Sequence, residues 1–223
     1  MLSNYTQQVL EVFKLHEDPS LAISMSKYMR NKFEYFGINS PTRKEISKPL
    51  LAHTFIPEAD KIPGIIMELW NQPQRELQYF ALELLQKYAK KSPAEWIYLY
   101  VELITTKSWW DSVDGLAANQ VGGHFKRYPD LIEDLTDKWM ASKNIWLQRT
   151  CLIFQLRYKH DTDFELMKSF IIPLVASNEF FIKKAIGWAL RQYGKFNPKA
   201  VIDFVEHQSM SHLSRKEALK LIN

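Results

Sequence analysis

One pattern recurs along the chain at a spacing that restricts the fold more than any other feature. Residues 78–82 (QYFAL) lead to Tyr88, residues 148–152 (QRTCL) lead to Tyr158, and residues 183–187 (KKAIG) lead to Tyr193. The three tyrosines are 70 and 35 residues apart. A period of 35 residues fits a unit of two helices, which cannot bury its apolar face alone and has to stack on its neighbours. The repeat therefore predicts an all-α protein, an α-solenoid of stacked antiparallel helix pairs.

The rest of the sequence is also typical of helices. It has only 7 glycines in 223 residues, and apolar residues recur at spacings of three and four rather than alternating. Proline directly after a capping residue marks helix starts at Ser40-Pro41 and Ser92-Pro93. We expect helices after Ser20 and Ser40 and over residues 4–16, 60–71, 75–90, 95–106, 109–122, 131–142, 145–158, 163–176, 179–193, 198–207 and 215–222. Short loops between them predict antiparallel neighbours within a single domain over residues 1–223.

Composition excludes several classes of protein. With 46% hydrophobic residues and 13% aromatics, the 223 residues suffice for one substantial core. No run of about 18 apolar residues would span a membrane, and the first residues do not resemble a signal peptide, so we expect a cytoplasmic protein. The single cysteine, Cys151, excludes an internal disulfide, and the six histidines form no HExxH pair. We therefore expect no metal and no cofactor, and we expect a monomer.

Positive charge is concentrated in the C-terminal half. Residues 143–199 contain ten Lys or Arg against four Asp or Glu, a net charge of +6. The whole chain has 29 against 25, so the remainder has 19 against 21, a net charge of −2. Clustered positive charge is the electrostatic pattern of a nucleic-acid binder, although ordinary surfaces also reach this excess. We expect a basic concave face on the solenoid.

The segment TTKSWWDSVD at residues 105–114 contains the strongest candidates for chemistry. Ser108 is expected to cap a helix, with Asp111 completing a capping box three residues later. Helical spacing then directs Trp109 to the core and places Trp110 and Asp114, four residues apart, together on a neighbouring face. An indole and a carboxylate therefore lie side by side.

The 35-residue period extends this site to two further units. Asp114, Arg149 and Lys184 are separated by 35 and 35 residues, so in a regular stack they occupy the same position on successive units. An arginine beside a carboxylate favours its charged form, so we expect Asp114 to have a low pKa and to be an anion. A carboxylate suits reactions that develop positive charge, such as cleavage of a glycosidic bond through an oxocarbenium-like transition state. Trp188 projects from the helix two units later and is expected to close the far side, where indole faces attract a cation.

Three motifs in order carry a family resemblance. SWWDSVD, then NIWLQR at residues 144–149 and AIGWALR at residues 185–191, closely resemble the AlkD family of bacterial alkylpurine DNA glycosylases, which are built from HEAT-like repeats. KYMRNKF, ELW, LQKY and EFFIKKAIGW extend the similarity nearly from end to end. The resemblance implies that Trp110, Asp114 and Arg149 form the active site and that Trp188 helps to cradle the sugar of the damaged nucleotide. It also implies excision of N3- and N7-alkylated purines without drawing the base into a pocket.

The expected partner is double-stranded DNA containing alkylated purines, and no membrane. Tyr28 matches a family residue near the lesion, Asn39 stands where the family has a glutamine near DNA, and Arg157 stands where it has a lysine. Basic residues position a duplex through its phosphates without reading its sequence. The expected DNA-binding residues are Tyr28, Asn39, Arg157, Lys183, Lys184 and Arg191.

Other interpretations of the same residues are open. Trp110 and Trp188 would be ordinary core or interface aromatics, since large aromatics on helices usually pack. Asp114 would be a surface acid bridged to Arg149, and the row with Lys184 an exposed face. The alternative function is a non-catalytic helical-repeat module that binds damaged or branched DNA or a protein partner. Removing the carboxylate of Asp114 separates the two functions, because only the enzyme requires it.

Overall fold

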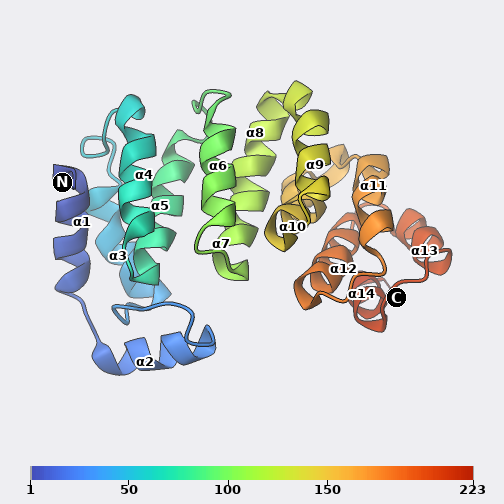
Figure 1. Ribbon diagram of the computed structural model, residues 1–223, viewed down its shortest axis with the longest axis horizontal. Coiled ribbons are helices and arrows are strands. Elements are labelled where there is room, and N and C mark those ends of the chain that lie inside the picture. Colours follow the sequence, from blue (N-terminus) through green and yellow to red (C-terminus); the bar gives the residue numbers. More distant parts are fainter. Residues whose placement is uncertain (1, 223) are drawn as a thin grey trace. The chain divides into compact units, whose positions relative to one another are not determined.

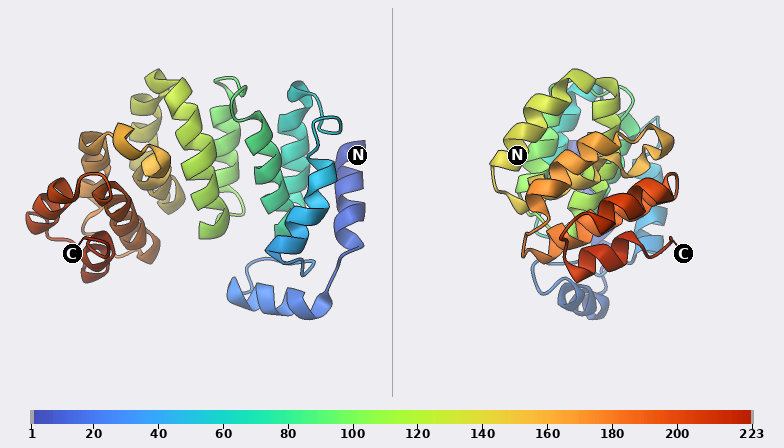
Figure 2. Two further views of the ribbon diagram at one scale, coloured as in Figure 1. Left: turned by 180° about the vertical axis from the view of Figure 1, so that it is seen from behind. Right: turned by 90° about the vertical axis from the view of Figure 1, so that its right-hand side faces the viewer.

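The computed structural model describes residues 2–222, which form helices joined by loops and turns (Figures 1 and 2). The only β-pairing in the described part is an isolated bridge between Glu34 and Gln74. The predicted all-α helical-repeat fold is confirmed. The chain forms two compact units, Met1–Ser92 and Pro93–Asn223, which are described here one at a time. The single-domain expectation stays a prediction.

The first unit surrounds an aromatic core with helices. Its helices are α1 (Asn4–Lys14), α2 (Pro19–Tyr28), α3 (Ser40–Leu50), α4 (Ile62–Asn71) and α5 (Arg75–Tyr88). Phe13 of α1 packs edge-on against Phe80 of α5 with ring centroids 5.6 Å apart, and both side chains are fully buried. Helix α2 has no buried residue. Burial of α1, α4 and α5 therefore holds this unit together.

A buried carboxylate fixes the loop that follows α2. Glu76 of α5 is fully buried and accepts backbone N–H bonds from Phe36, Gly37 and Ile38 at 2.9–3.1 Å. Gly37 has a φ of +89°, and a Cβ atom there would lie 2.0 Å from the carbonyl oxygen of Asp18. Only glycine fits such a conformation and such a close approach. The loop thereby returns the chain to α3 in one defined path.

The second unit is built around α10 (Ile145–Ile153). This helix contacts α6 (Trp96–Thr105), α7 (Trp110–Gly115), α9 (Ile132–Ala141), α11 (Phe164–Leu174) and α12 (Phe180–Gly194). The remaining helices are α8 (Gly122–Arg127), α13 (Pro198–Glu206) and α14 (His212–Ala218). Cys151 is 2% exposed on α10, and burial raises the pKa of its thiol. No helix among residues 2–222 has the length and apolar character that crossing a membrane requires.

Several predicted helix starts were wrong by a few residues. Asp18, not Ser20, caps α2, and Asn39, not Ser40, caps α3 by accepting the Thr42 N–H at 3.0 Å. The last helix spans His212–Ala218 rather than residues 215–222. In each case a capping side chain with the right geometry lies one to four residues earlier than predicted.

Candidate active site

A buried ion pair joins α7 to α10. The guanidinium of Arg149 donates from Nε to Oδ1 of Asp114 at 2.7 Å and from Nη2 to Oδ2 at 2.8 Å. Its remaining nitrogen, Nη1, donates to the backbone carbonyl of Phe181 on α12 at 2.5 Å. The side chain of Arg149 is 5% exposed and that of Asp114 is 18% exposed. Arg149 therefore holds three helices together and fixes the orientation of one carboxylate.

The predicted low pKa of Asp114 was wrong in direction. Burial raises the pKa of the Asp114 carboxyl above its ordinary value, while the hydrogen bonds and charge of Arg149 act to lower it. Desolvation disfavours the charged form of the carboxyl, and its effect on the pKa is larger than that of Arg149. The guanidinium nevertheless stays protonated at any working pH, and a neutral Asp114 would leave it buried and unpaired. At neutral pH the pair therefore retains the carboxylate as an anion.

An aromatic cluster supports the ion pair. The rings of Trp109, Trp146 and Phe181 lie 5.0–5.8 Å apart by centroid in all three pairings. Trp109 is 8% exposed, so its predicted place in the core is confirmed. Asn144 caps α10 by accepting the backbone N–H of Trp146 at 2.9 Å. These contacts fix the start of α10, from which Arg149 projects one turn later.

Ser108 does not cap α7 as predicted. The cap residue is Trp109, with no side-chain cap bond, and the Ser108 hydroxyl instead donates to the carbonyl of Ile104 at 2.6 Å. Ser108 thus closes the end of α6 rather than opening α7. Trp110 is the first residue of α7, one turn before Asp114, and is half-buried.

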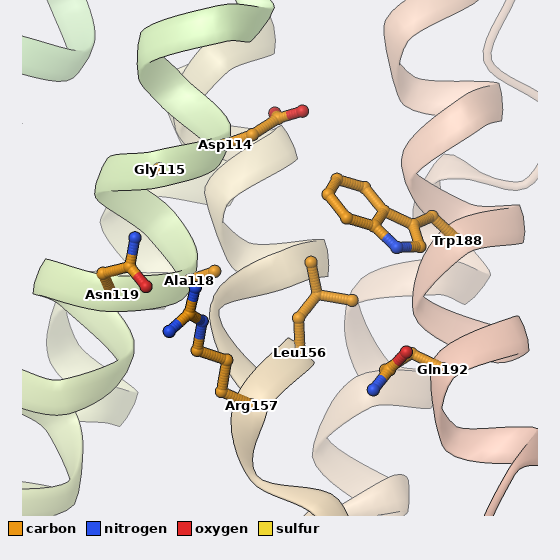
Figure 3. A pocket seen from close by; sticks show the side chains of 8 residues that line it. All are labelled: Asp114, Gly115, Ala118, Asn119, Leu156, Arg157, Trp188 and Gln192. Carbon is orange, nitrogen blue, oxygen red and sulfur yellow. The ribbon is translucent and has the colours of Figure 1, made fainter. Parts of the chain in front are cut away.

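Asp114 opens onto a cavity of about 320 Å³ within the second unit (Figure 3). Trp188 of α12 lies across the cavity from Asp114. Leu156 lies between these two side chains and the end of the cavity that is lined by Arg157 and Gln192. The indole of Trp188 therefore faces the same space as the carboxylate, as the sequence predicts. The eight lining residues are Asp114, Gly115, Ala118, Asn119, Leu156, Arg157, Trp188 and Gln192.

A π-helix shapes one wall of this cavity. The predicted continuous helix over residues 109–122 was wrong, because α7 gives way to the π-helical segment η2 (Leu116–Val121) before α8 begins. Ala118 and Asn119 both belong to this segment, and both line the cavity. The π-helical segment therefore contributes an amide side chain to the cavity wall.

Gly122 allows η2 to pack closely on the next segment. A Cβ atom at Gly122 would lie 2.3 Å from the backbone oxygen of Phe154, and the Tyr158 hydroxyl donates to the Gly122 carbonyl at 2.8 Å. Phe154 begins the 3-10 turn η4 (Phe154–Arg157), which continues α10. The backbone at Gly122 therefore packs directly against the backbone at Phe154. Arg157, at the end of η4, lines the cavity.

The predicted row of charges ends after two members. Asp114 and Arg149 pair as the 35-residue period predicts, but Lys184 pairs with Glu217 of α14 at 2.9 Å. Arg191 donates to the other oxygen of Glu217 at 2.6 Å. A Cβ atom at Gly187 would lie 2.5 Å from Cβ of Glu217, so glycine lets α14 pack directly on α12. This packing brings the carboxylate between the two cations.

The remaining predicted DNA-binding residues take no part in these ion pairs. Lys183 is half-buried, and its backbone carbonyl accepts from Ser214 at 3.0 Å. Arg157 is exposed at the cavity, and no acidic side chain in the described part of the chain pairs with it. In the first unit, Tyr28 is 75% exposed at the end of α2 and Asn39 caps α3. Their roles in binding DNA stay predictions.

Sequence reasoning missed Asn119, Gln192, Glu217 and the Phe181 carbonyl. Gln192 follows Trp188 by four residues, a spacing that would have indicated a shared face. No pattern in the sequence signals the π-helix or the packing of α14 on α12. Among residues 2–222, no three His, Cys, Asp or Glu side chains gather where they could hold a metal ion.

Fold and site together define a helical-repeat protein with a buried carboxylate–guanidinium pair at a cavity lined by both polar and apolar side chains. The family model of the DNA alkylation repair enzymes matches residues 9–222, and the chain belongs to this family. It is similar to the solved structure of a protein described as a predicted DNA alkylation repair enzyme from Enterococcus faecalis. The two are 32% identical over 92% of this chain and 96% of the other, with a TM-score of 0.86. No curated protein sequence matches the chain.

Proposed function

We propose that this DNA alkylation repair enzyme is a monofunctional DNA glycosylase acting in base excision repair. Its substrates would be cationic N3- and N7-alkylated purines, such as 3-methyladenine and 7-methylguanine, in duplex DNA. The observation that carries the proposal is the Asp114 carboxylate, held by two hydrogen bonds from Arg149 and facing Trp188 across a cavity.

The substrate itself determines what the site has to supply. An N3- or N7-alkylated purine carries a positive charge, so it leaves as a neutral base when the N-glycosidic bond breaks and takes the bonding electrons. No acid is needed to protonate it. The positive charge passes to the sugar, which becomes oxocarbenium-like, and a water adds to the sugar carbon and loses a proton. One anion close to the sugar is therefore the main requirement.

Asp114 fits this requirement because it is oriented before the substrate arrives. The bidentate bond from Arg149 leaves the carboxylate no freedom to rotate, so stabilising the sugar cation costs little reorganisation. The indole faces of Trp188 and Trp110 would add cation–π attraction of about 0.5–2 kcal/mol each, depending on desolvation. Such a site selects substrates by the lability of the bond rather than by the shape of the base.

Basic side chains would hold the duplex around this site. Phosphate contacts position DNA without carrying sequence information, which suits an enzyme that searches for lesions. We assign this role to Arg157 and Lys183, together with Lys184 and Arg191 when DNA competes with Glu217 for them. Tyr28 and Asn39 of the first unit would contact DNA near the lesion. The protein would act as a monomer.

Single-turnover release of 7-methylguanine from a duplex tests the proposal. We expect release by the wild type and a loss on the order of 10²-fold or more in Asp114→Asn, because an electrostatic partner of the transition state is removed. DNA binding should persist in that variant. Asp134→Asn is a matched control, since Asp134 is an exposed carboxylate paired with Lys138 on α9. If neither 7-methylguanine nor 3-methyladenine is released above the spontaneous rate, the non-catalytic DNA-binding module becomes the better account.

A further inference from the structure

Each cation of the predicted row of charges has a carboxylate as its partner. Arg149 pairs with Asp114 at 2.7 Å, and Lys184 pairs with Glu217 at 2.9 Å. Glu217 follows Lys184 by 33 residues, close to one further 35-residue period. The four ionised side chains together carry no net charge. In the free protein they therefore offer little attraction to an anion such as DNA.

Packing of α14 on α12 holds Glu217 between two cations. Lys184, Gly187 and Arg191 are spaced by three and four residues, so they share one face of α12. Glycine lets α14 approach this face, because a Cβ atom at Gly187 would lie 2.5 Å from Cβ of Glu217. One carboxylate oxygen, Oε1, then contacts Lys184 at 2.9 Å, and Oε2 contacts Arg191 at 2.6 Å. The helix packing therefore fixes the carboxylate in place.

Glu217 makes the contacts that a DNA phosphate would make with the same two cations. Phosphate oxygens accept charge-assisted hydrogen bonds from lysine and arginine. The Glu217 carboxylate likewise offers two oxygen acceptors and a negative charge to Lys184 and Arg191. Its contacts with these cations lower the pKa of Glu217, so the carboxylate is charged at neutral pH. Both cations are therefore already engaged in the free protein.

The exposure of these side chains allows the partners to be exchanged. The side chain of Lys184 is 36% exposed and that of Arg191 is 23% exposed, whereas that of Arg149 is 5% exposed. Ion pairs near the surface are weak because solvent screens them. A phosphate can therefore take Lys184 and Arg191 from Glu217, but only by breaking two contacts of the folded protein.

We propose that Glu217 is an autoinhibitory residue, an internal competitor that occupies Lys184 and Arg191 and lowers the affinity of the protein for duplex DNA. This inference rests on the proposed function, in which the two cations contact phosphates. Every duplex has to displace the carboxylate, whether or not it contains a lesion. Lower affinity is expressed mainly as faster dissociation. The contact therefore shortens the time that the protein spends on undamaged DNA and on its product.

Affinity for an undamaged duplex, measured by fluorescence anisotropy at low salt, tests this inference. Glu217→Gln keeps the size of the side chain and removes its charge. It should bind roughly three- to tenfold tighter than the wild type, as expected when two weak competing ion pairs are lost. Asp134→Asn is the matched control, because it removes an equal charge from an ion pair with Lys138 on α9 of the same unit. It should raise the affinity much less.

A double-mutant cycle shows whether the gain comes from the masked cations. Lys184→Gln should cost more DNA affinity in the Glu217→Gln background than in the wild type, because the lysine is fully available to DNA only when the carboxylate is gone. Thermal unfolding checks that each variant is folded. If Glu217→Gln is too unstable to assay, Glu217→Asp keeps the charge on a side chain shorter by one methylene, and it should give a smaller gain in the same direction.

Unchanged or weaker binding by the folded variant would overturn the inference, because a merely structural glutamate would give no gain in affinity when it is replaced. An equal gain in Asp134→Asn, or a Lys184→Gln penalty that is the same in both backgrounds, would overturn it too. Since the duplex is undamaged, the readout is separate from the glycosylase activity. If the wild type releases no base but Glu217→Gln shows the gain, the proposed reaction falls and the autoinhibitory contact stands. Base release without the gain would do the opposite.

Discussion

At the scale of single residues, Arg149 holds the site together. It bonds both oxygens of Asp114 and the carbonyl of Phe181 from a nearly buried position. Arg149→Met would leave a mostly buried carboxylate without its partner, and such changes cost about 3–5 kcal/mol of folding free energy. Urea unfolding measures this loss.

The double variant Asp114→Asn/Arg149→Met should recover part of the lost stability, because it no longer contains an unpaired charge. Losses that simply add across the cycle would contradict the coupling between the two side chains. The double variant should still release no base, which separates stability from chemistry.

The raised pKa of Asp114 predicts the acid side of the activity profile. Burial is the cause of the shift, and the reaction needs the anion. Activity should therefore fall as the pH drops through the pKa of Asp114, at a higher pH than the ordinary aspartate value of about 3.9. Single-turnover rates between pH 4 and 8 would show this limb. A rate that stays flat to the ordinary value, with the protein folded, would contradict the assignment.

The sequence predicted this ion pair but not its energetics. Asp114 and Arg149 occupy equivalent positions one 35-residue period apart, and stacking of repeats brings equivalent positions together. Desolvation depends on what the surrounding helices cover, such as the Trp109, Trp146 and Phe181 cluster. No local pattern reports that, so the direction of the pKa shift was missed.

At the scale of elements, adjacent glycines give a matched test of the π-helix. A Cβ atom at Gly122 would clash with the Phe154 backbone, whereas one at Gly123 would meet nothing within 4 Å. Gly122→Ala should destabilise the protein by about 1–3 kcal/mol through overpacking. Gly123→Ala should be neutral or stabilising by up to about 1 kcal/mol, since alanine favours helix. Chemical denaturation of the two variants side by side decides this, and equal effects would contradict the close packing.

Glu217 gives α14 a pH-dependent attachment to α12. Its ion pairs with Lys184 and Arg191 lower the pKa of Glu217 in the folded protein. A lowered folded pKa contributes stability above the unfolded value of about 4.3 and loses it as the pH falls through the folded value. Glu217→Gln should thus be less stable than the wild type at pH 7, and the difference should vanish in acid. A difference that persists at low pH would indicate packing instead.

Element boundaries show where local sequence signals end. Apolar spacing predicted nearly every helix, because one face of each helix is buried. It could not predict that residues 116–121 form a π-helix, since a 3.6-residue pattern continues through them and close packing on η4 decides the geometry. Asn119 was missed for the same reason. Lys184 was expected beside Arg149, but α14, through Gly187, gives it Glu217 instead.

At the scale of the whole molecule, charge predicts how DNA binding responds to salt. The chain has a net charge of +4, and residues 143–199 contribute +6. Affinity for undamaged duplex should fall linearly on a plot of log K against log salt, because bound cations release counterions from DNA. Arg157→Ala should reduce the slope by about 1. A slope that is flat for the wild type would argue against phosphate contacts by the basic half.

The burial of Cys151 has a practical consequence. It is the one cysteine of the chain, lies two residues after Arg149 on α10, and is 2% exposed. A thiol reagent reaches it only when the surrounding helices open, so its rate of modification reports local unfolding at the helix that carries Arg149. The native protein thus contains its own reporter, and slower labelling in the presence of DNA would measure how much substrate rigidifies this helix.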